Sequence, residues 1–352
     1  MITLAFGTRP DAIKLGPIAA ELRLLEVPIE VVCTGQHTDL LRGTPAETDL
    51  RDSSSLGLKS DGNVMRWVHA SQRPLQEALL AADIVVVQGD TMSAYAAAQA
   101  ATKLEKVLVH VEAGVRSHAL DEPWPEERFR IQIDEHADWH YAATPHAFAN
   151  LLAEGHEIQR IRVTGNSVVS ALARYAGAQP CDPADHCLVT LHRREWMDGP
   201  HFVTVLDALF EAARDHAAAR FIWPMHPTVA KRLSQNWVKS APPNFLLMSP
   251  LPYREAAGLL AHAFGVLTDS GGLVEEAATL GVPSVQLRNV SDRPEAIDAG
   301  VSRLEAPTPE GVHRAMEALT TGIMPRRPSP VFGDVTAAAQ IARALAQLDP
   351  TC

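Results

Sequence analysis

The chain has 352 residues, of which 46% are hydrophobic and 21% are charged, ordinary values for a globular enzyme. Because this length exceeds what one hydrophobic core usually supports, we expect two domains. The formal net charge of -11 leaves no overall basic surface, which argues against nucleic acid and anionic membranes as main partners.

The N-terminus enters an apolar strand directly, without the basic region and cleavage site of a secretory signal. No apolar run approaches the roughly 20 residues that span a bilayer. The 4 cysteines show no Cys-x-x-Cys spacing and are too few to staple a chain of this length. We therefore expect a cytoplasmic protein that is not bound to a membrane.

The first predicted elements are a strand over 3–6, a helix to residue 25, a strand over 29–33, a short helix with loops over 44–60, and a helix over 63–81. Arg9 stands between the first strand and its helix, where backbone N–H groups attract anions. A surface salt bridge is the simpler explanation of Arg9 alone, but Lys14, one turn later, favours anion binding. Gln36 and His37 form a second polar cluster at the end of the next strand.

Residues 84–127 are the stretch around which the rest of the chain is expected to be organised. Two short β-branched runs, separated by a helical segment, are typical of buried parallel strands in a βαβ unit. The runs lead to Asp90 and Glu112, and the carboxyl ends of parallel strands meet at one edge of a sheet. Both acids should therefore face one crevice, with Glu126 or Glu127 nearby at a helix start. Crowded carboxylates raise one another's pKa, which suits acid–base work.

The elements that follow are a helix to 137, a strand over 139–142, a helix over 145–154, a strand over 161–163 and a helix over 167–175. Residues 176–185 lose apolar periodicity and gain proline, which is typical of a domain boundary. The second half repeats the alternation with strands over 188–191, 220–223, 245–248, 264–268 and 284–287, and ends in a helix over 336–348. This alternation predicts two doubly wound α/β domains.

Residues 269–272, Asp-Ser-Gly-Gly, give the strongest local signal of the second half. Glycines at a helix start let the backbone N–H groups approach a diphosphate, and Glu276 could accept hydrogen bonds from ribose hydroxyls. A capped structural helix explains the tetrapeptide equally well. The stretch is neither a Walker loop nor the Gly-x-Gly-x-x-Gly fingerprint, so ATP and a nicotinamide cofactor are disfavoured.

His192 follows a predicted strand and precedes two arginines. A lone histidine is usually structural, but Arg193 and Arg194 are costly to bury unpaired, so an anion-facing loop is the more economical interpretation. His226 is a similar, weaker case. No His-x-x-x-His or comparable spacing supports a metal site.

Nine motifs together resemble the series of the UDP-N-acetylglucosamine 2-epimerase family and occur in the family's order. They are GTRPDAIK (7–14), TGQH (34–37), GDT (89–91), HVEAGVR (110–116), PWPEE (123–127), TGN (164–166), HRRE (192–195), DSGG (269–272) and RPEA (293–296). Nine motifs in register are far more specific than any one of them.

The resemblance implies a glycosyltransferase-B type architecture, in which two Rossmann-like domains face each other across a cleft. Residues 1–170 would be the sugar-side domain, 171–333 the UDP-binding domain, and 334–352 a helix that packs back on the first. The family works as homodimers without a metal or redox cofactor. By similarity, the catalytic set would be Asp90, Glu112, Glu126 and His192. The UDP-sugar would be bound by Arg9, Lys14, Arg116, His226, Ser270, Gly271, Gly272, Glu276 and Arg293, and an allosteric site would include Gln36 and His37.

The implied reaction inverts carbon 2 of a UDP-N-acetylhexosamine by anti elimination of UDP to a 2-acetamidoglycal and re-addition. Two faces of one carbon require two acid–base groups, and the departing diphosphate requires cations and N–H donors. The alternatives are a hydrolysing epimerase that releases free sugar and UDP, a glycosyltransferase of the same fold, and a sugar-nucleotide sensor without catalysis. Ser117–Asp121 and Arg128–Arg130 depart from the family pattern close to the expected sugar site, so the identity of the sugar stays open.

Overall fold

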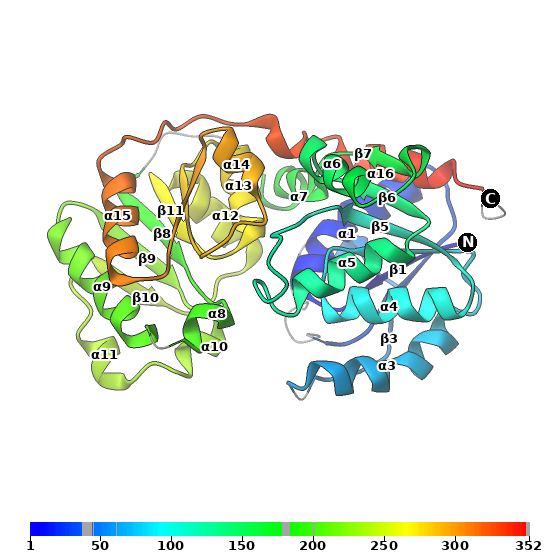
Figure 1. Ribbon diagram of the computed structural model, residues 1–352, viewed down its shortest axis with the longest axis horizontal. Helices are drawn as coiled ribbons and strands as arrows, with labels where there is room; N and C mark the ends of the chain where they lie inside the picture. The colour runs from blue at the N-terminus through cyan, green and yellow to red at the C-terminus, as the bar shows by residue number, and fades with distance from the viewer. Residues whose placement is uncertain (37–43, 45, 61, 178–183, 200, 350–352) are drawn as a thin grey trace. The chain divides into compact units, whose positions relative to one another are not determined.

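The computed structural model describes residues 1–36, 44, 46–60, 62–177, 184–199 and 201–349. The chain forms two compact units, which we call the first unit (Met1–Tyr175 with Gly333–Cys352) and the second unit (Ala176–Phe332). Both are built on a parallel sheet with helices (Figure 1). The predicted class, α/β with two doubly wound units, is therefore confirmed.

The sheet of the first unit, within the described residues, has seven parallel strands in the order β3-β2-β1-β4-β5-β6-β7. Their bounds are β1 (Ile2–Phe6), β2 (Ile29–Cys33), β3 (Ser54–Ser55), β4 (Ile84–Gln88), β5 (Val107–Ala113), β6 (Trp139–Ala142) and β7 (Ile161–Val163). The strand β3 falls in a segment predicted as helix and loops; it consists of two exposed serines that pair with β2 and carry no apolar pattern.

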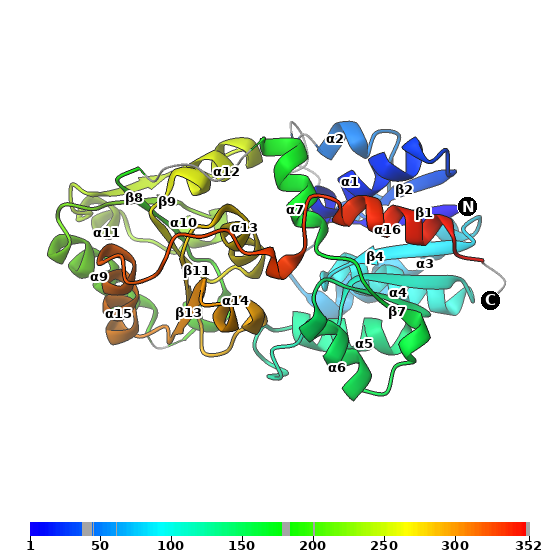
Figure 2. The ribbon, with the colours of Figure 1, turned by 90° about the horizontal axis from the view of Figure 1, so that it is seen from above.

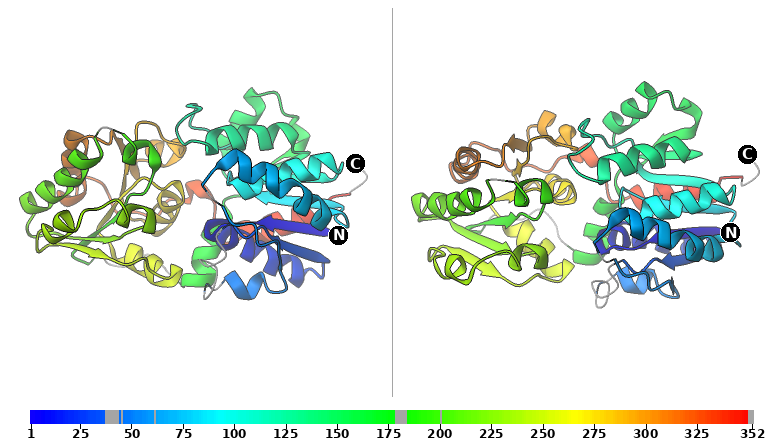
Figure 3. Two further views of the ribbon diagram at one scale, coloured as in Figure 1. Left: turned by 90° about the horizontal axis from the view of Figure 1, so that it is seen from below. Right: turned by 60° about the horizontal axis from the view of Figure 1, so that its bottom comes forward.

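The helices of the first unit are α1 (Arg9–Leu24), α2 (Ala46–Asp49), α3 (Val64–Leu79), α4 (Met92–Lys103), α5 (Glu126–His136), α6 (Pro145–Ala153), α7 (Ser167–Ala171) and α16 (Ala337–Ala346). Alternate strand residues, such as Val85 and Val87, pack against α3, α4 and α5. Figure 3 shows α3 and α4 side by side in blue and cyan. Helix α16 lies along α1 and α7 (Figure 2), and Ser170 of α7 hydrogen-bonds the main chain of Val335 and Ala338.

The sheet of the second unit repeats this topology. In the part of the chain that is described, it has six parallel strands in the order β10-β9-β8-β11-β12-β13. Their bounds are β8 (His186–Thr190), β9 (Arg220–Pro224), β10 (Phe245–Met248), β11 (Gly265–Thr268), β12 (Ser284–Leu287) and β13 (Ser302–Glu305). The edge strand β13 was not predicted, because its residues do not form an apolar run.

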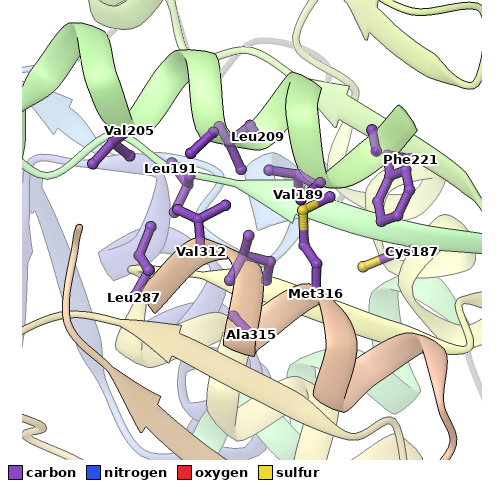
Figure 4. Packing of buried hydrophobic residues seen from close by; sticks show 14 of the residues in the cluster. Cys187, Val189, Leu191, Val205, Leu209, Phe221, Leu287, Val312, Ala315 and Met316 are labelled. Carbon is purple, nitrogen blue, oxygen red and sulfur yellow. The ribbon is translucent and has the colours of Figure 1, made fainter. Parts of the chain in front are cut away.

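The helices of the second unit are α8 (Arg194–Met197), α9 (Phe202–Asp215), α10 (Pro227–Ala230), α11 (Gln235–Lys239), α12 (Tyr253–His262), α13 (Gly271–Leu280), α14 (Pro294–Asp298) and α15 (Pro309–Thr320). The apolar faces of α9 and α15 meet the sheet in a core where Leu209 and Met316 lie near Val189 (Figure 4). In the residues that the structure describes, every helix is too short or too polar to span a lipid bilayer.

Candidate active site

Each sheet has one point at which the strand order reverses. In the first unit this switch lies between β1 and β4, and in the second unit between β8 and β11. Ligands of open α/β sheets bind outside the carboxyl ends of the strands at such a switch. Arg9 follows β1 and Asp90 follows β4, whereas His192 follows β8 and Ser270 follows β11. In each unit these candidate residues therefore lie where the topology of its own sheet predicts a ligand.

At the switch point of the first unit, the side chain of Asp11 connects the loop after β1 to the loop after β4. Its carboxylate accepts hydrogen bonds from the backbone N–H groups of Gly7 (3.2 Å) and Thr8 (3.1 Å) and from the Thr91 hydroxyl (3.1 Å). Burial raises the pKa of Asp11 to about 6, although these hydrogen bonds act in the opposite direction. Arg9, half-buried, begins α1 directly beside this connection.

Glu112 lies at an irregular position of β5. Its φ of 68° is in the left-handed region, and the pairing of β5 with β6 shifts register between Val111 and Ala113. The Glu112 Oε2 accepts from Lys14 Nζ (2.5 Å) and from Gln88 Nε2 (2.5 Å). Such backbone strain costs of order 1–3 kcal/mol and tends to occur at functional sites, which supports a functional role for this carboxylate.

Asp90 forms an ion pair with Arg130 of α5. Arg130 is buried, and its Nη1 lies 3.3 Å from Glu127 Oε2. Gly89 makes the turn before Asp90 with a φ of 64°. Sequence reasoning missed Arg130. Its position four residues after Glu126 was the available signal, because that spacing places both residues on one face of a helix.

The adjacent acids at the start of α5 have different surroundings. Glu127 is completely buried, and its two carboxylate oxygens accept from the backbone N–H groups of Ser117 and His118, each bond being 3.0 Å long. It therefore holds the loop that follows β5, in which His118 has a φ of 59°. Glu126 is half-buried at the first position of the helix.

Arg116, predicted to bind substrate, has internal contacts. Its guanidinium donates to Glu154 through Nε (2.8 Å) and Nη2 (2.6 Å), to Asp134 through Nη2 (2.7 Å) and to the carbonyl of Val115. The side chain is 1% exposed. Through these contacts Arg116 stabilises the chain after β5.

A buried His110–Asp134 pair connects that network to the loop carrying Asp90. The His110 Nδ1 is 2.6 Å from Asp134 Oδ1, and its Nε2 is 2.8 Å from the carbonyl oxygen of Gly89. Burial would raise the pKa of Asp134, but the charges of His110 and Arg116 outweigh it and hold the pKa well below its usual range. The sequence did not predict the pairing of His110 with Asp134, because nothing in the sequence links two residues that lie 24 positions apart.

Gln36 lies at the same edge of the first sheet. Its Oε1 accepts from the Ser93 hydroxyl (2.7 Å), which is also 2.7 Å from Thr34 Oγ1. A Cβ on Gly7 would lie 1.9 Å from Ser93 Oγ, so this packing requires glycine. His37 lies outside the described residues.

In the second unit, Asp269 and His192 form the corresponding centre. The ring Nδ1 of His192 is 3.1 Å from Asp269 Oδ1, and the ring stacks on His226 with 5.5 Å between centroids. Asp269 is completely buried, whereas the His192 side chain is 37% exposed. The structure thus brings His192 and His226 together.

The side chain of Arg293 packs against the start of α13. Its Nε donates to Glu275 (2.5 Å), and a Cβ on Gly271 would lie only 3.3 Å from its guanidinium carbon. At Gly272 a Cβ would meet no atom of the described residues within 4 Å. The backbone N–H of Ser270 donates to Thr268, so the glycines carry the helix N–H groups best placed for an anion. Glu276 accepts from the Tyr253 hydroxyl (2.9 Å).

The units therefore offer different chemistry. The first has carboxylates with basic partners at its switch, suited to proton transfer and to stabilising positive charge on a sugar ring. The second has a helix start, an arginine and histidines, suited to a diphosphate. Among the described residues, no three His, Cys, Asp or Glu side chains gather as a metal ion would require.

The family model for UDP-N-acetylglucosamine 2-epimerase matches residues 22–346. The chain belongs to the UDP-N-acetylglucosamine 2-epimerase family. The predicted resemblance is thereby confirmed. The UDP-N-acetylglucosamine 2-epimerase of Salmonella typhimurium is 34% identical over 325 residues, with 86% of each chain covered. That of Yersinia pestis is 32% identical, with 91% of this chain and 89% of the relative covered.

Solved structures of the epimerase family share the whole fold. The Neisseria meningitidis enzyme bound to UDP-GlcNAc matches with a TM-score of 0.88 at 27% identity, with 99% of each chain covered. The Methanocaldococcus jannaschii enzyme in complex with UDP-GlcNAc and UDP matches with a TM-score of 0.86 at 30% identity, with 98% of each chain covered.

Proposed function

We propose that this protein is a non-hydrolysing epimerase that interconverts UDP-N-acetylglucosamine and UDP-N-acetylmannosamine or a close analogue. The observation that carries the proposal is the strained Glu112, held by Lys14 and Gln88 at the switch point of the first sheet. Family membership and the solved relatives bound to UDP-GlcNAc support the choice of sugar nucleotide.

The proton on carbon 2 has no adjacent carbonyl, so its removal cannot produce an enolate. In the proposed first step a base takes this proton while the bond between carbon 1 and the diphosphate oxygen breaks. The products are UDP and a 2-acetamidoglycal with a double bond between carbons 1 and 2. UDP then adds back to carbon 1, a proton is delivered to the opposite face of carbon 2, and no water is consumed.

The proposed roles follow the chemistry of each unit. Asp90, Glu112 and Glu126 serve the sugar, because two faces of carbon 2 require two acid–base groups and the ring gains oxocarbenium character. Arg9, His192 and the N–H groups of Gly271 and Gly272, which follow Ser270 at the start of α13, stabilise the departing diphosphate. Glu276 accepts from the ribose. We assign Arg116 and Glu127 to holding the loop after β5, given their internal contacts.

Proton NMR of the reaction in deuterated water tests the proposal. We expect deuterium at carbon 2 of both UDP-sugars and no free N-acetylmannosamine. Accumulation of free sugar with UDP would instead identify a hydrolysing epimerase. A failure to exchange the carbon 2 proton of any UDP-N-acetylhexosamine would refute both epimerase forms.

A further inference from the structure

Gly89, which precedes Asp90, has both of its backbone polar groups bonded to β5. Its N–H donates to the carbonyl oxygen of Val111 (3.0 Å), and its own carbonyl oxygen lies 2.8 Å from the ring Nε2 of His110. Gly89 has a φ of 64°, in the left-handed region that favours glycine. The two contacts therefore fix the orientation of the turn that leads from β4 to Asp90.

The ring of His110 is completely buried and is hydrogen-bonded through both nitrogens. A backbone carbonyl oxygen only accepts hydrogen bonds, so Nε2 must carry the hydrogen that it shares with Gly89. On the other side of the ring, Nδ1 lies 2.6 Å from Oδ1 of Asp134, a short distance that is typical of a strong hydrogen bond. The two bonds together oppose rotation of the ring away from Gly89.

Asp134, in α5, is a fixed anchor for this ring. It is completely buried, and its Oδ2 accepts from Nη2 of Arg116 (2.7 Å) and from the backbone N–H of Gly114 (3.1 Å). A buried carboxylate that is hydrogen-bonded through both oxygens keeps its position. A continuous series of contacts therefore runs from Asp134 through His110 to the peptide bond that precedes Asp90.

We propose that His110 is a positioning residue, whose Nε2–H fixes the peptide bond between Gly89 and Asp90 and thereby directs the Asp90 carboxylate at the sugar. This inference rests on the proposed function, in which Asp90 serves the sugar. Arg130 holds the carboxylate of Asp90 through an ion pair, whereas His110 holds the backbone from which that side chain extends. A displacement of about 1 Å at a reacting group can lower the rate about 100-fold.

Two substitutions of His110 separate the two contacts of the ring. The side chain of His110→Asn reaches only as far as the ring Nδ1, so it can donate to Asp134 but not to the carbonyl oxygen of Gly89. The side chain of His110→Gln reaches as far as the ring Nε2, so it can keep the bond to Gly89 and loses the bond to Asp134. Each variant removes one hydrogen bond of the same buried side chain, which makes His110→Gln the matched control.

We expect kcat to fall about 100-fold in His110→Asn and at most about tenfold in His110→Gln. The Kd for UDP should be the same in both variants as in the wild-type protein, because neither Arg9 nor the start of α13 is changed. An equal fall of kcat in the two variants, or a larger fall in His110→Gln, would overturn the proposal.

Backbone NMR gives a readout that needs no turnover, because the amide N–H of Asp90 belongs to the peptide bond that His110 holds. The Asp90 amide signal should move from its wild-type position in His110→Asn, and move much less in His110→Gln. Equal displacement of this signal in the two variants would contradict the role of His110, since a general loss of packing affects both.

A long-range ¹H–¹⁵N spectrum of the wild-type protein completes the test. It should show hydrogen on Nε2 of His110, and a bare Nε2 overturns the proposal even if neither variant folds. If the ring and amide signals are as expected but no UDP-sugar is turned over, the proposed function alone is refuted.

Discussion

Glu127→Gln should destabilise the first unit, because it removes a buried charge on which the loop after β5 depends. The carboxylate accepts from the N–H groups of Ser117 and His118 and lies 3.3 Å from the Arg130 guanidinium. Hydrogen bonds to a charged group contribute about 1.5–3 kcal/mol, and removing one partner of a buried ion pair costs about 3–5 kcal/mol. Since glutamine keeps one acceptor oxygen, we expect a loss of about 3 kcal/mol.

Differential scanning calorimetry and urea unfolding would measure this loss. For a unit of this size, 1 kcal/mol shifts Tm by about 2–4 °C, so about 3 kcal/mol corresponds to a decrease of roughly 6–12 °C. Glu135→Gln is the matched control, because Glu135 lies exposed on the same helix. It should change the unfolding free energy by less than about 0.5 kcal/mol. Equal stability of the two variants would refute the assignment of Glu127 as the support of this loop.

Arg130→Lys keeps the charge but loses the planar fork beside Asp90, so we expect kcat to fall about 10- to 100-fold with little change in KM, measured by steady-state kinetics. Gly271→Ala places a Cβ 3.3 Å from the Arg293 guanidinium carbon, and should raise the Kd for UDP about tenfold in calorimetric titrations. Burial raises the pKa of Asp11 in the folded state to about 6, above the ordinary value of 3.8 for an aspartate, so the folded state binds more protons between these values. Its contribution to stability is therefore complete below pH 4 and is lost as pH rises to about 6. Asp11→Asn should remove about 3 kcal/mol of this pH dependence in urea unfolding.

Each of these variants has a control or a contradicting result. Arg128→Lys alters an exposed arginine of the same helix and should leave kcat unchanged. Gly258→Ala adds a Cβ where no described atom lies within 4 Å, and should leave the Kd for UDP unchanged. An unfolding free energy of Asp11→Asn that depends on pH as steeply as that of the wild-type protein would show that the buried carboxyl does not take up a proton.

Sequence patterns predicted the main strands because the signal there is local. The runs that became β4 and β5 are apolar on both faces, as buried central strands require. The strands β3 and β13 were missed because neither carries an apolar run, whereas the edge strands β7 and β10 were predicted from theirs; β3 and β13 are defined by pairing with a neighbour. Propensity alone does not determine an edge strand.

The candidate site was predicted as a set of residue types, but not as a set of contacts. Strand ends identified Asp90 and Glu112, yet the partners Arg130 and Lys14 lie 40 and 98 positions away in the chain. The choice between Glu126 and Glu127 depends on helix phase and on the loop that Glu127 binds. Such long-range pairings are decided by packing, which a single sequence does not display.

The pairing of buried acids with basic side chains explains how a chain with a net charge of -11 can suit an anionic ligand. Beyond about 8 Å at physiological salt, the overall negative field is screened, so the local charges decide binding. Four acids near the two switch points form ion pairs with lysine or arginine, namely Glu112–Lys14, Asp90–Arg130, Glu275–Arg293 and Asp292–Arg288. With these acids compensated, the N–H groups at the start of α13 set the local potential that the proposed diphosphate ligand would meet. Removing the base of such a pair would leave an uncompensated acid. That acid would both destabilise the fold and repel the proposed anionic ligand.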